Sequence, residues 1–228
     1  MTHQKRLSAP KHYPIERKQN TYVATGEGPH SEDVGIPLVV FLREVLGYAE
    51  SSSEAKEILE SRNVRVNGRV ETDVQRTIGF MDVISIEKAD KDFRVLLDSD
   101  GLVFREAEDP ETRIRRIEDK TTLNGGVTQL NLDGGENQVV DDEYDTQSSV
   151  VIDTEDQAIQ HELPLEEGNQ AYIIGGRHVG TVATIQEHEV TRGPQSNRVT
   201  LETEDGEAFE TVEEYVYVIG EDEPEVTL

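Results

Sequence analysis

The stretch Val64-Arg65-Val66-Asn67-Gly68-Arg69-Val70 decides the fold of the first half of the chain. Alternating valine and arginine is typical of strands, and Asn-Gly is a strong β-hairpin signal. A simple two-residue turn would pair Val66 with Arg69 and would not keep the valines together. We therefore expect a bulge or a non-hairpin exit there. A further strand is predicted over residues 81–86, after a turn at Gly79.

Two short helices are predicted before this hairpin. Pro37 suits a first helical position, and an apolar stripe at helical spacing runs from it to Gly47. Ser51 and Glu54 form a capping box for the second helix. The two apolar faces consist of Leu38, Phe41, Leu42, Val45 and Leu46 in the first helix, and of Ala55, Ile58 and Leu59 in the second. Residues 37–93 thus form a small domain of helices followed by strands.

The rest of the chain divides into four segments. Residues 1–36 are expected to form an extended basic arm, of the kind that orders along a phosphate backbone; the alternative is an ordinary disordered terminus. Residues 94–168 are predicted to form a central all-β domain, because short β-rich segments alternate with turn signals. Residues 169–219 contain a strand, a glycine-rich turn and further strands, and residues 220–228 form an acidic tail. The turn signals are Asp100-Gly101, Asn124-Gly125-Gly126 and Asp133-Gly134-Gly135. The predicted fold class is multi-domain α+β.

The net charge of −26 is very unevenly distributed. Residues 1–120 contain 19 Lys and Arg against 23 Asp and Glu, whereas residues 121–228 contain three against 25. Taken alone, such acidity predicts repulsion from nucleic acid. Acidic, lysine-poor surfaces are also a device of proteins from very salty cells, where the Debye length falls to about 3 Å at 1 M salt. We favour salt adaptation over an ordinary acidic tail.

Composition excludes several other classes. With 34% hydrophobic and 5% aromatic residues, the chain is expected to build several small cores rather than a large one. The absence of cysteine removes disulfides, thiolate metal sites and cysteine nucleophiles. No apolar run approaches the roughly 18 residues of a membrane span, and residues 1–20 lack the apolar core of a signal peptide. We expect a soluble, intracellular protein with no membrane partner.

No catalytic or cofactor motif is found. The glycines of Gly175-Gly176-x-x-x-Gly180 have the wrong spacing for a dinucleotide fingerprint, and a strand follows them. The histidines lack zinc-binding spacing, and residues 141–145 lack the glycine of a calcium loop. We therefore predict no enzyme activity, no metal, no cofactor and no small-molecule substrate.

The candidate RNA contacts are mostly arginines, whose planar guanidinium groups contact phosphates and stack on bases. Asn67 and Gly68 could let the backbone approach an RNA strand. The alternative is a solvated surface in which these arginines pair with the interleaved glutamates. The candidates in the first domain are Arg43, Lys56, Arg62, Arg65, Asn67, Gly68, Arg69 and Arg76; the arm adds Arg6, Lys11, His12 and Arg17.

Residues 37–86 resemble the S4-type RNA-binding domain, through Phe41-Leu42-Arg43, the hairpin stretch and the segment from Gly79 to Ile86. The chain as a whole resembles the archaeal and eukaryotic ribosomal S4e family, also through residues 7–13 and 28–30. Gly175-Gly176-Arg177-His178-Val179-Gly180 resembles the KOW motif, which implies a small β-barrel over residues 169–219 and adds Gly176, Arg177 and His178 as RNA contacts. His178 and Thr181 depart from that motif's usual Asn and basic residue.

The resemblance implies a structural constituent of the small ribosomal subunit in the cytoplasm. The implied partners are small-subunit rRNA, in particular its 5′ domain, and neighbouring small-subunit proteins. Two alternatives remain at this point: an RNA-modifying enzyme such as a pseudouridine synthase, and a KOW-bearing transcription factor. The first would need a catalytic domain for which residues 94–168 are too short and too rich in turns.

Overall fold

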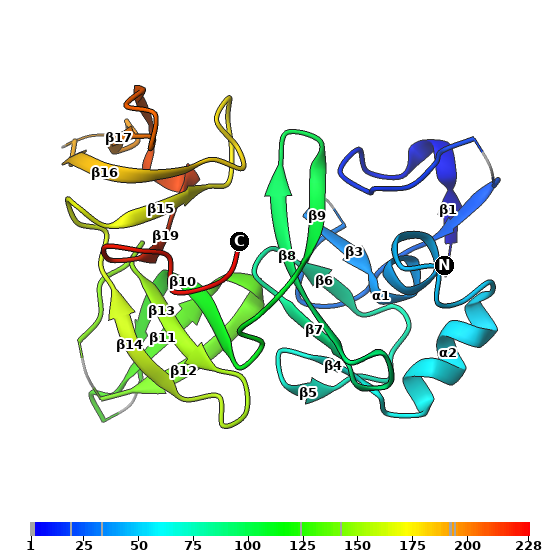
Figure 1. Cartoon of the computed structure of the whole chain (residues 1–228). Coiled ribbons are helices and arrows are strands. Elements are labelled where there is room, and N and C mark those ends of the chain that lie inside the picture. The colour runs from blue at the N-terminus through cyan, green and yellow to red at the C-terminus, as the bar shows by residue number, and fades with distance from the viewer. Residues whose placement is uncertain are drawn as a thin grey trace. The chain divides into compact units, whose positions relative to one another are not determined.

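The computed structural model describes residues 3–18, 20–32, 34–123, 125–141, 143–191, 193 and 195–228. The chain forms two compact units, Met1–Glu111 and Thr112–Leu228 (Figure 1). Strands predominate and helices are few, and both helices labelled in Figure 1 belong to the first unit. No helix in the described part of the chain is long and apolar enough to cross a membrane. The turn signal at Asn124 lies outside the described residues.

The main sheet of the first unit has five antiparallel strands in the order β5-β4-β7-β8-β9. They are β4 (Val64–Val66), β5 (Arg69–Val70), β7 (Val83–Ile86), β8 (Lys91–Asp98) and β9 (Gly101–Glu106). Two antiparallel pairs accompany this sheet: β1 (His3–Lys5) with β2 (Tyr22–Ala24), and β3 (Gly35–Pro37) with β6 (Thr77–Gly79). Helices α1 and α2 supply much of the core that packs with the sheet, through Leu38, Ala55 and Leu59, all fully buried.

The first predicted helix is present but has a different start and a different pitch. Pro37 ends β3, where pairing with Thr77 keeps it extended, and α1 (Leu38–Val40) follows it. The chain then widens into a π-helical turn, η2 (Phe41–Val45), in which Leu46 N donates to Phe41 O at 3.0 Å. The predicted stripe still faces inward, since Phe41 and Leu42 are fully buried.

The capping box of the second helix, α2 (Ser52–Glu60), is confirmed in its main feature. Ser51 Oγ accepts a hydrogen bond from Glu54 N at 3.2 Å. The Glu54 carboxylate returns to the N–H of Glu50 at 2.7 Å rather than to that of Ser51. The helix therefore begins where the sequence predicts it.

The hairpin is confirmed, but the expected bulge is wrong. Asn67 and Gly68 have φ of 52° and 79°, as a two-residue type I′ turn requires, and Val66 pairs directly with Arg69. The register needs no correction because β5 is an edge strand whose two residues are both exposed. The Val70 side chain is therefore exposed in this register, and no bulge is needed to bury it.

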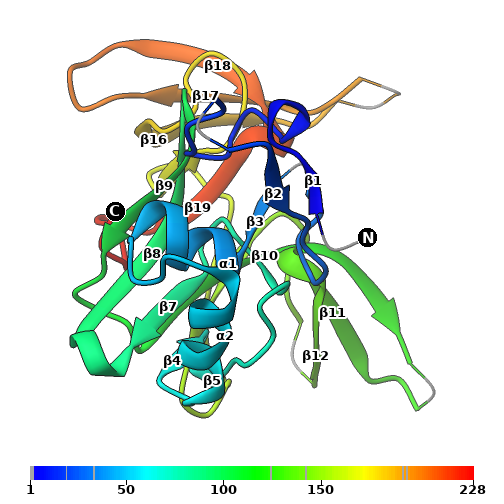
Figure 2. The same cartoon turned by 90° about the vertical axis from the view of Figure 1, so that its right-hand side faces the viewer.

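The expectation of an extended N-terminal arm is corrected by the structure. Within it, β1 pairs with β2, and Figure 2 shows both near α1; Ala9, Tyr13 and Val23 join the core of the first unit. An arm of 36 residues with these apolar side chains gains more from burying them than from staying extended.

The expected boundary between residues 93 and 94 also differs from the structure. It falls inside β8, which pairs with β7 on one side and with β9 on the other. The ribbon of β8 and β9 therefore extends the sheet of the first unit, and the units divide between Glu111 and Thr112.

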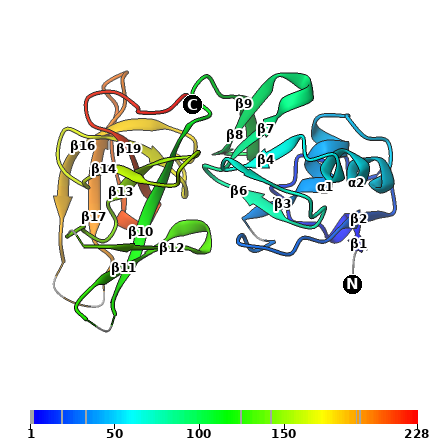
Figure 3. The same cartoon turned by 90° about the horizontal axis from the view of Figure 1, so that it is seen from below.

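The second unit contains two five-stranded antiparallel sheets (Figure 3). The first has the order β12-β11-β10-β13-β14, and the second has the order β18-β17-β16-β15-β19. The strands are β10 (Thr112–Thr122), β11 (Thr128–Leu132), β12 (Glu136–Val140), β13 (Ser149–Asp153), β14 (Ile159–Leu163), β15 (Gln170–Ile173), β16 (Val182–Glu189), β17 (Arg198–Glu202), β18 (Ala208–Val212) and β19 (Val216–Gly220). The change of sheet between β14 and β15 lies where the expected boundary at 168/169 falls, although both sheets belong to one unit.

The acidic end is not a free tail. Glu225 N donates to Ile219 O at 2.8 Å, and Val226 is buried. The expectation for residues 220–228 is therefore corrected: the segment folds back, with Val226 buried and Glu225 bonded to Ile219.

A buried polar cluster connects the two sheets of the second unit. Tyr217 of β19 lies with its hydroxyl 3.0 Å from Ile114 O and 3.2 Å from Asp133 Oδ2. The N–H of Arg116 donates to Asp133 Oδ1 at 2.8 Å. Burial raises the pKa of the Asp133 carboxyl, and it raises the pKa of Tyr217 as well.

Candidate RNA-binding surface

Two arginines of the first unit, Arg62 and Arg69, project into solvent without an ion-pair partner among the described residues. Arg62 follows the C-cap of α2 with φ of 61°, and Arg69 lies on the edge strand β5. Two exposed guanidinium groups are thus available to an outside anion.

Arg65 is also accessible, but it lies on the other face of the hairpin. It pairs with Val70, whereas Arg69 pairs with Val66, and paired residues share a face. Arg65 Nε lies 2.8 Å from Glu87 Oε1, and its guanidinium donates to Gly68 O at 3.2 Å. The hairpin therefore presents cations on both faces rather than one cluster.

The remaining candidates of the first domain are paired with acidic or polar neighbours, as the alternative interpretation expects. Lys56 lies 3.5 Å from Glu60 on α2, and Arg76 lies 3.1 Å from Glu71. Arg43 donates to Ser52 Oγ at 3.1 Å and lies 3.6 Å from Glu44. The Lys56–Glu60 pair is exposed, and an exposed pair contributes only about 0–1 kcal/mol, so a phosphate can replace that carboxylate.

Asn67 has an internal role, which corrects its assignment as an RNA contact. The residue is only 3% exposed, and its Nδ2 donates to Asp82 Oδ1 at 2.8 Å. Its Oδ1 accepts a hydrogen bond from Val83 N at 2.9 Å. Gly68 remains at the turn, where its positive φ is the feature that the hairpin needs.

Asp82 is the centre of a buried network that the sequence does not reveal. Besides Asn67, it accepts hydrogen bonds from Gly79 N at 2.9 Å and lies 2.9 Å from His30 Nε2. The N–H of His30 donates to Thr77 Oγ1 at 3.1 Å. The network ties the arm to the strands, and a buried aspartate among apolar residues is the only local signal that could have indicated it.

Two arm cations make hydrogen bonds within the first unit. Arg6 is 1% exposed and donates to both carboxylate oxygens of Glu44, at 3.1 and 2.8 Å. The hydrogen bond from Arg6 lowers the pKa of Glu44 and raises that of Arg6. Arg17 donates to the carbonyl oxygens of Ala9, at 2.6 Å, and Pro10. Arg6 is therefore corrected from an RNA contact to a cation that holds the arm on the unit, whereas the half-buried Arg17 bonds to carbonyl oxygens within the arm.

The other two arm candidates differ in exposure. Lys11 is exposed, whereas the half-buried His12 has Nε2 3.0 Å from Gly35 O. Lys11 is therefore the more accessible of the two.

The KOW-like candidates lie on the turn between β15 and β16. Gly176 has φ of 80°, Arg177 is exposed, and the His178 ring stacks on Phe209 at 4.1 Å and 12°. His178 also borders a pocket that Glu204 and Asp205 line. This turn thus offers one exposed cation in acidic surroundings.

The surface of the second unit is more acidic than its composition indicates. The unit contains seven Lys and Arg against 27 Asp and Glu. Two of the arginines, Arg113 and Arg115, are buried, and Arg113 donates to both carboxylate oxygens of Glu136 at 2.8 Å. Because these two arginines are buried, most exposed charges of this unit are carboxylates.

Three family models match successive parts of the chain: the RS4NT (NUC023) domain at residues 2–33, the S4 domain at 36–84 and ribosomal family S4e at 89–159. Together with the exposed arginines, the S4 match defines an RNA-binding protein. The chain belongs to the ribosomal S4e family, because relatives from that family match it over nearly its whole length.

The small ribosomal subunit protein eS4 of Methanosphaera stadtmanae is 43% identical over 99% of this chain and 95% of its own length. The protein of the same name from Haloarcula marismortui is 40% identical over 96% of each chain. The crystal structure of the 30S ribosomal protein S4e from Thermoplasma acidophilum has a TM-score of 0.70 and 26% identity, and covers 83% of this chain and 96% of that one.

Proposed function

We propose that the chain binds small-subunit rRNA chiefly through exposed cations of its first unit, as a structural constituent of the small ribosomal subunit. The observation that carries this proposal is the exposure of Arg62 and Arg69 on the S4-type domain, without acidic partners among the described residues. Arg65, Lys11 and Lys56 are further accessible cations of the first unit. No chemistry is performed, and the place of action is the cytoplasmic ribosome.

The finer assignment is the 5′ domain of the rRNA, with neighbouring small-subunit proteins as further partners. Family membership supports this role over an RNA-modifying enzyme or a transcription factor.

The binding operates in concentrated salt. Net charge of −26 would repel RNA in dilute buffer, but near 1 M salt fields beyond about 3 Å are screened. The affinity for RNA then depends on groups in direct contact with it, and the surface carboxylates keep the chain hydrated. Burial of Arg113 and Arg115 beneath an acidic surface supports this salt-adapted character.

The second unit contributes a KOW-like element within residues 169–219. The order of β15, a glycine turn and β16 supports the assignment, and closure of this sheet into a small barrel is part of the proposal. Arg177 and the stacked His178 are its contacts with RNA, weaker than those of the first unit because acidic residues surround them.

The salt dependence of rRNA binding tests the proposal. Full-length chain is titrated with transcribed small-subunit rRNA at several KCl concentrations. Arg62→Gln and Arg69→Gln should each weaken binding and reduce the slope of log K against log salt by about one. Arg198→Gln, at an exposed arginine of the second unit that pairs with Glu210, is the matched control and should leave the slope unchanged. Equal slopes for wild type and both first-unit variants would reject these contacts.

A further inference from the structure

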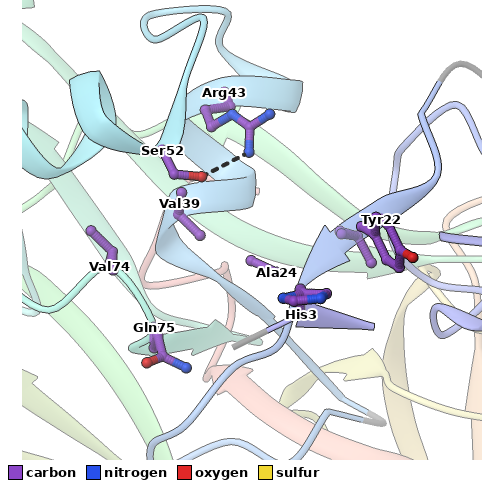
Figure 4. Close-up of a pocket in the computed structure, with 9 residues that line it drawn as sticks. His3, Tyr22, Ala24, Val39, Arg43, Ser52, Val74 and Gln75 are labelled. Carbon is purple, nitrogen blue, oxygen red and sulfur yellow. Dashed lines mark hydrogen bonds between the residues drawn. The ribbon is translucent and has the colours of Figure 1, made fainter. Parts of the chain in front are cut away.

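A pocket of about 330 Å³ lies in the first unit between the β1–β2 ribbon, the α1–η2 helix and the segment before β6. Figure 4 shows Tyr22 and His3 on one side of it and Val74 and Gln75 on the other. The volume is at the lower end of the range for small-ligand sites. The pocket contains none of the exposed arginines described above.

The first wall of the pocket is aromatic. Tyr22 is 55% exposed, and its ring meets the His3 ring edge-on, with centroids 5.0 Å apart and planes at 76°. An edge-on partner leaves a face of the Tyr22 ring uncovered by His3. Val39 and Val74 add apolar surface across the pocket. This combination suits a flat, aromatic ligand.

The remaining wall is cationic and polar. Arg43 is held by Ser52, whose Oγ accepts from its guanidinium at 3.1 Å (Figure 4). Glu44, its nearest acidic neighbour, is already engaged by Arg6 through two hydrogen bonds. The side-chain amide of Gln75 makes a long hydrogen bond of 3.4 Å to Thr25 O. A cation held by Ser52 and an amide thus line the same pocket as the exposed aromatic ring.

We infer that this pocket binds one unstacked nucleotide of the rRNA. The base stacks on Tyr22, the phosphate meets Arg43, and Gln75 hydrogen-bonds to the base edge. Proteins recognise unpaired RNA in this way, by stacking splayed bases on aromatic rings and reading their edges. The inference rests on the proposed function, and it adds His3, Tyr22 and Gln75 to the binding surface.

A nucleotide accounts for the pocket better than an apolar protein side chain does. Arg43 lies 3.6 Å from Glu44, which also accepts two hydrogen bonds from Arg6, so an apolar side chain would leave Arg43 with only this shared counterion. A nucleotide supplies both a π-face for the Tyr22 ring and an anion for the Arg43 guanidinium.

Titration of the full-length chain with transcribed small-subunit rRNA tests the inference. Tyr22→Ala should weaken binding about tenfold, or about 1.4 kcal/mol, with an unchanged salt slope, because stacking releases no counterions. Tyr22→Phe should keep wild-type affinity. Arg43→Gln should lower the salt slope by about one. Tyr48→Ala, at an exposed tyrosine beside Glu54 and Glu57, is the control and should bind normally.

The outcomes separate the inference from the proposed function. If the wild type fails to bind rRNA, the proposed function fails. If the wild type binds and Tyr22→Ala binds within twofold of it, the nucleotide pocket is wrong. A Tyr22→Ala chain that binds free rRNA normally but is lost from assembled subunits would assign the pocket to a protein neighbour instead, which also overturns the inference. Thermal unfolding of each variant, expected to match wild type, excludes misfolding as the cause.

Discussion

Replacing Asn67 with alanine should unfold the hairpin region rather than remove an RNA contact. The change deletes the acceptor of Val83 N–H, a buried donor, and the donor to Asp82 Oδ1. An unsatisfied buried group costs about 1–3 kcal/mol, and a hydrogen bond to a charged group contributes about 1.5–3 kcal/mol. Alanine at φ of 52° adds about 1–2 kcal/mol that asparagine largely avoids.

The expected loss is therefore about 4 kcal/mol or more, out of a total stability of about 5–15 kcal/mol. Asn67→Gly separates the two causes, because glycine adopts positive φ freely but lacks the amide. It should be about 1 kcal/mol more stable than Asn67→Ala. Arg69→Ala, two residues along the same hairpin and exposed, should change stability by less than about 0.5 kcal/mol.

Urea unfolding at constant high KCl measures these values, since urea leaves the ionic strength unchanged. The rRNA affinity of the folded fraction should match wild type for Asn67→Gly and fall for Arg69→Ala. The reasoning is refuted if Asn67→Ala is as stable as wild type and binds rRNA more weakly than Arg69→Ala does.

Three further predictions concern stability. Arg6 lowers the pKa of Glu44 in the folded chain, so the pair stabilises the fold above the ordinary glutamate pKa of 4.5. This stabilisation is lost as the pH falls through the lowered pKa of Glu44. The difference in unfolding free energy between wild type and Glu44→Gln should therefore narrow from pH 7 to pH 3, and a constant difference would contradict this. Tyr217→Phe removes the hydroxyl between Ile114 and Asp133 and should lower the unfolding free energy, measured in urea, by about 1–3 kcal/mol. Tyr215→Phe, at a tyrosine 39% exposed, should lower it by less than about 0.5 kcal/mol. Equal losses of unfolding free energy would argue against a stabilising role of the buried cluster. Circular dichroism across a KCl series should show partial unfolding at low salt, because the net charge of −26 repels itself in a compact chain; a fold fully intact at low KCl would reject salt adaptation.

The elements that could be predicted depend on contacts between near neighbours in sequence. The Ser51–Glu54 cap spans four residues, and the Asn67-Gly68 turn spans two, so their signals lie within short windows. The expected bulge failed for a related reason. Whether β5 has a buried face depends on which strand lies beside it, and that information is not local.

The errors in the arm and the candidate site come from long-range partners. From the sequence alone Arg6 is taken for a free cation, because its partner Glu44 lies 38 residues away along the chain. Asn67 reads as a surface amide until Asp82 and Val83 are seen to engage both its ends. An exposed and a buried guanidinium are identical in sequence, so Arg62 and Arg69 could be separated from Arg6 only by the fold.

Sedimentation of a tagged chain from lysate kept at the salt concentration of the cytoplasm tests the central claim most directly. Wild type should sediment with the small ribosomal subunit, and Arg65→Glu combined with Arg69→Glu should remain in the supernatant while keeping its circular dichroism spectrum. Absence of the wild type from purified small subunits, or normal sedimentation of the double variant, would contradict binding through the first unit.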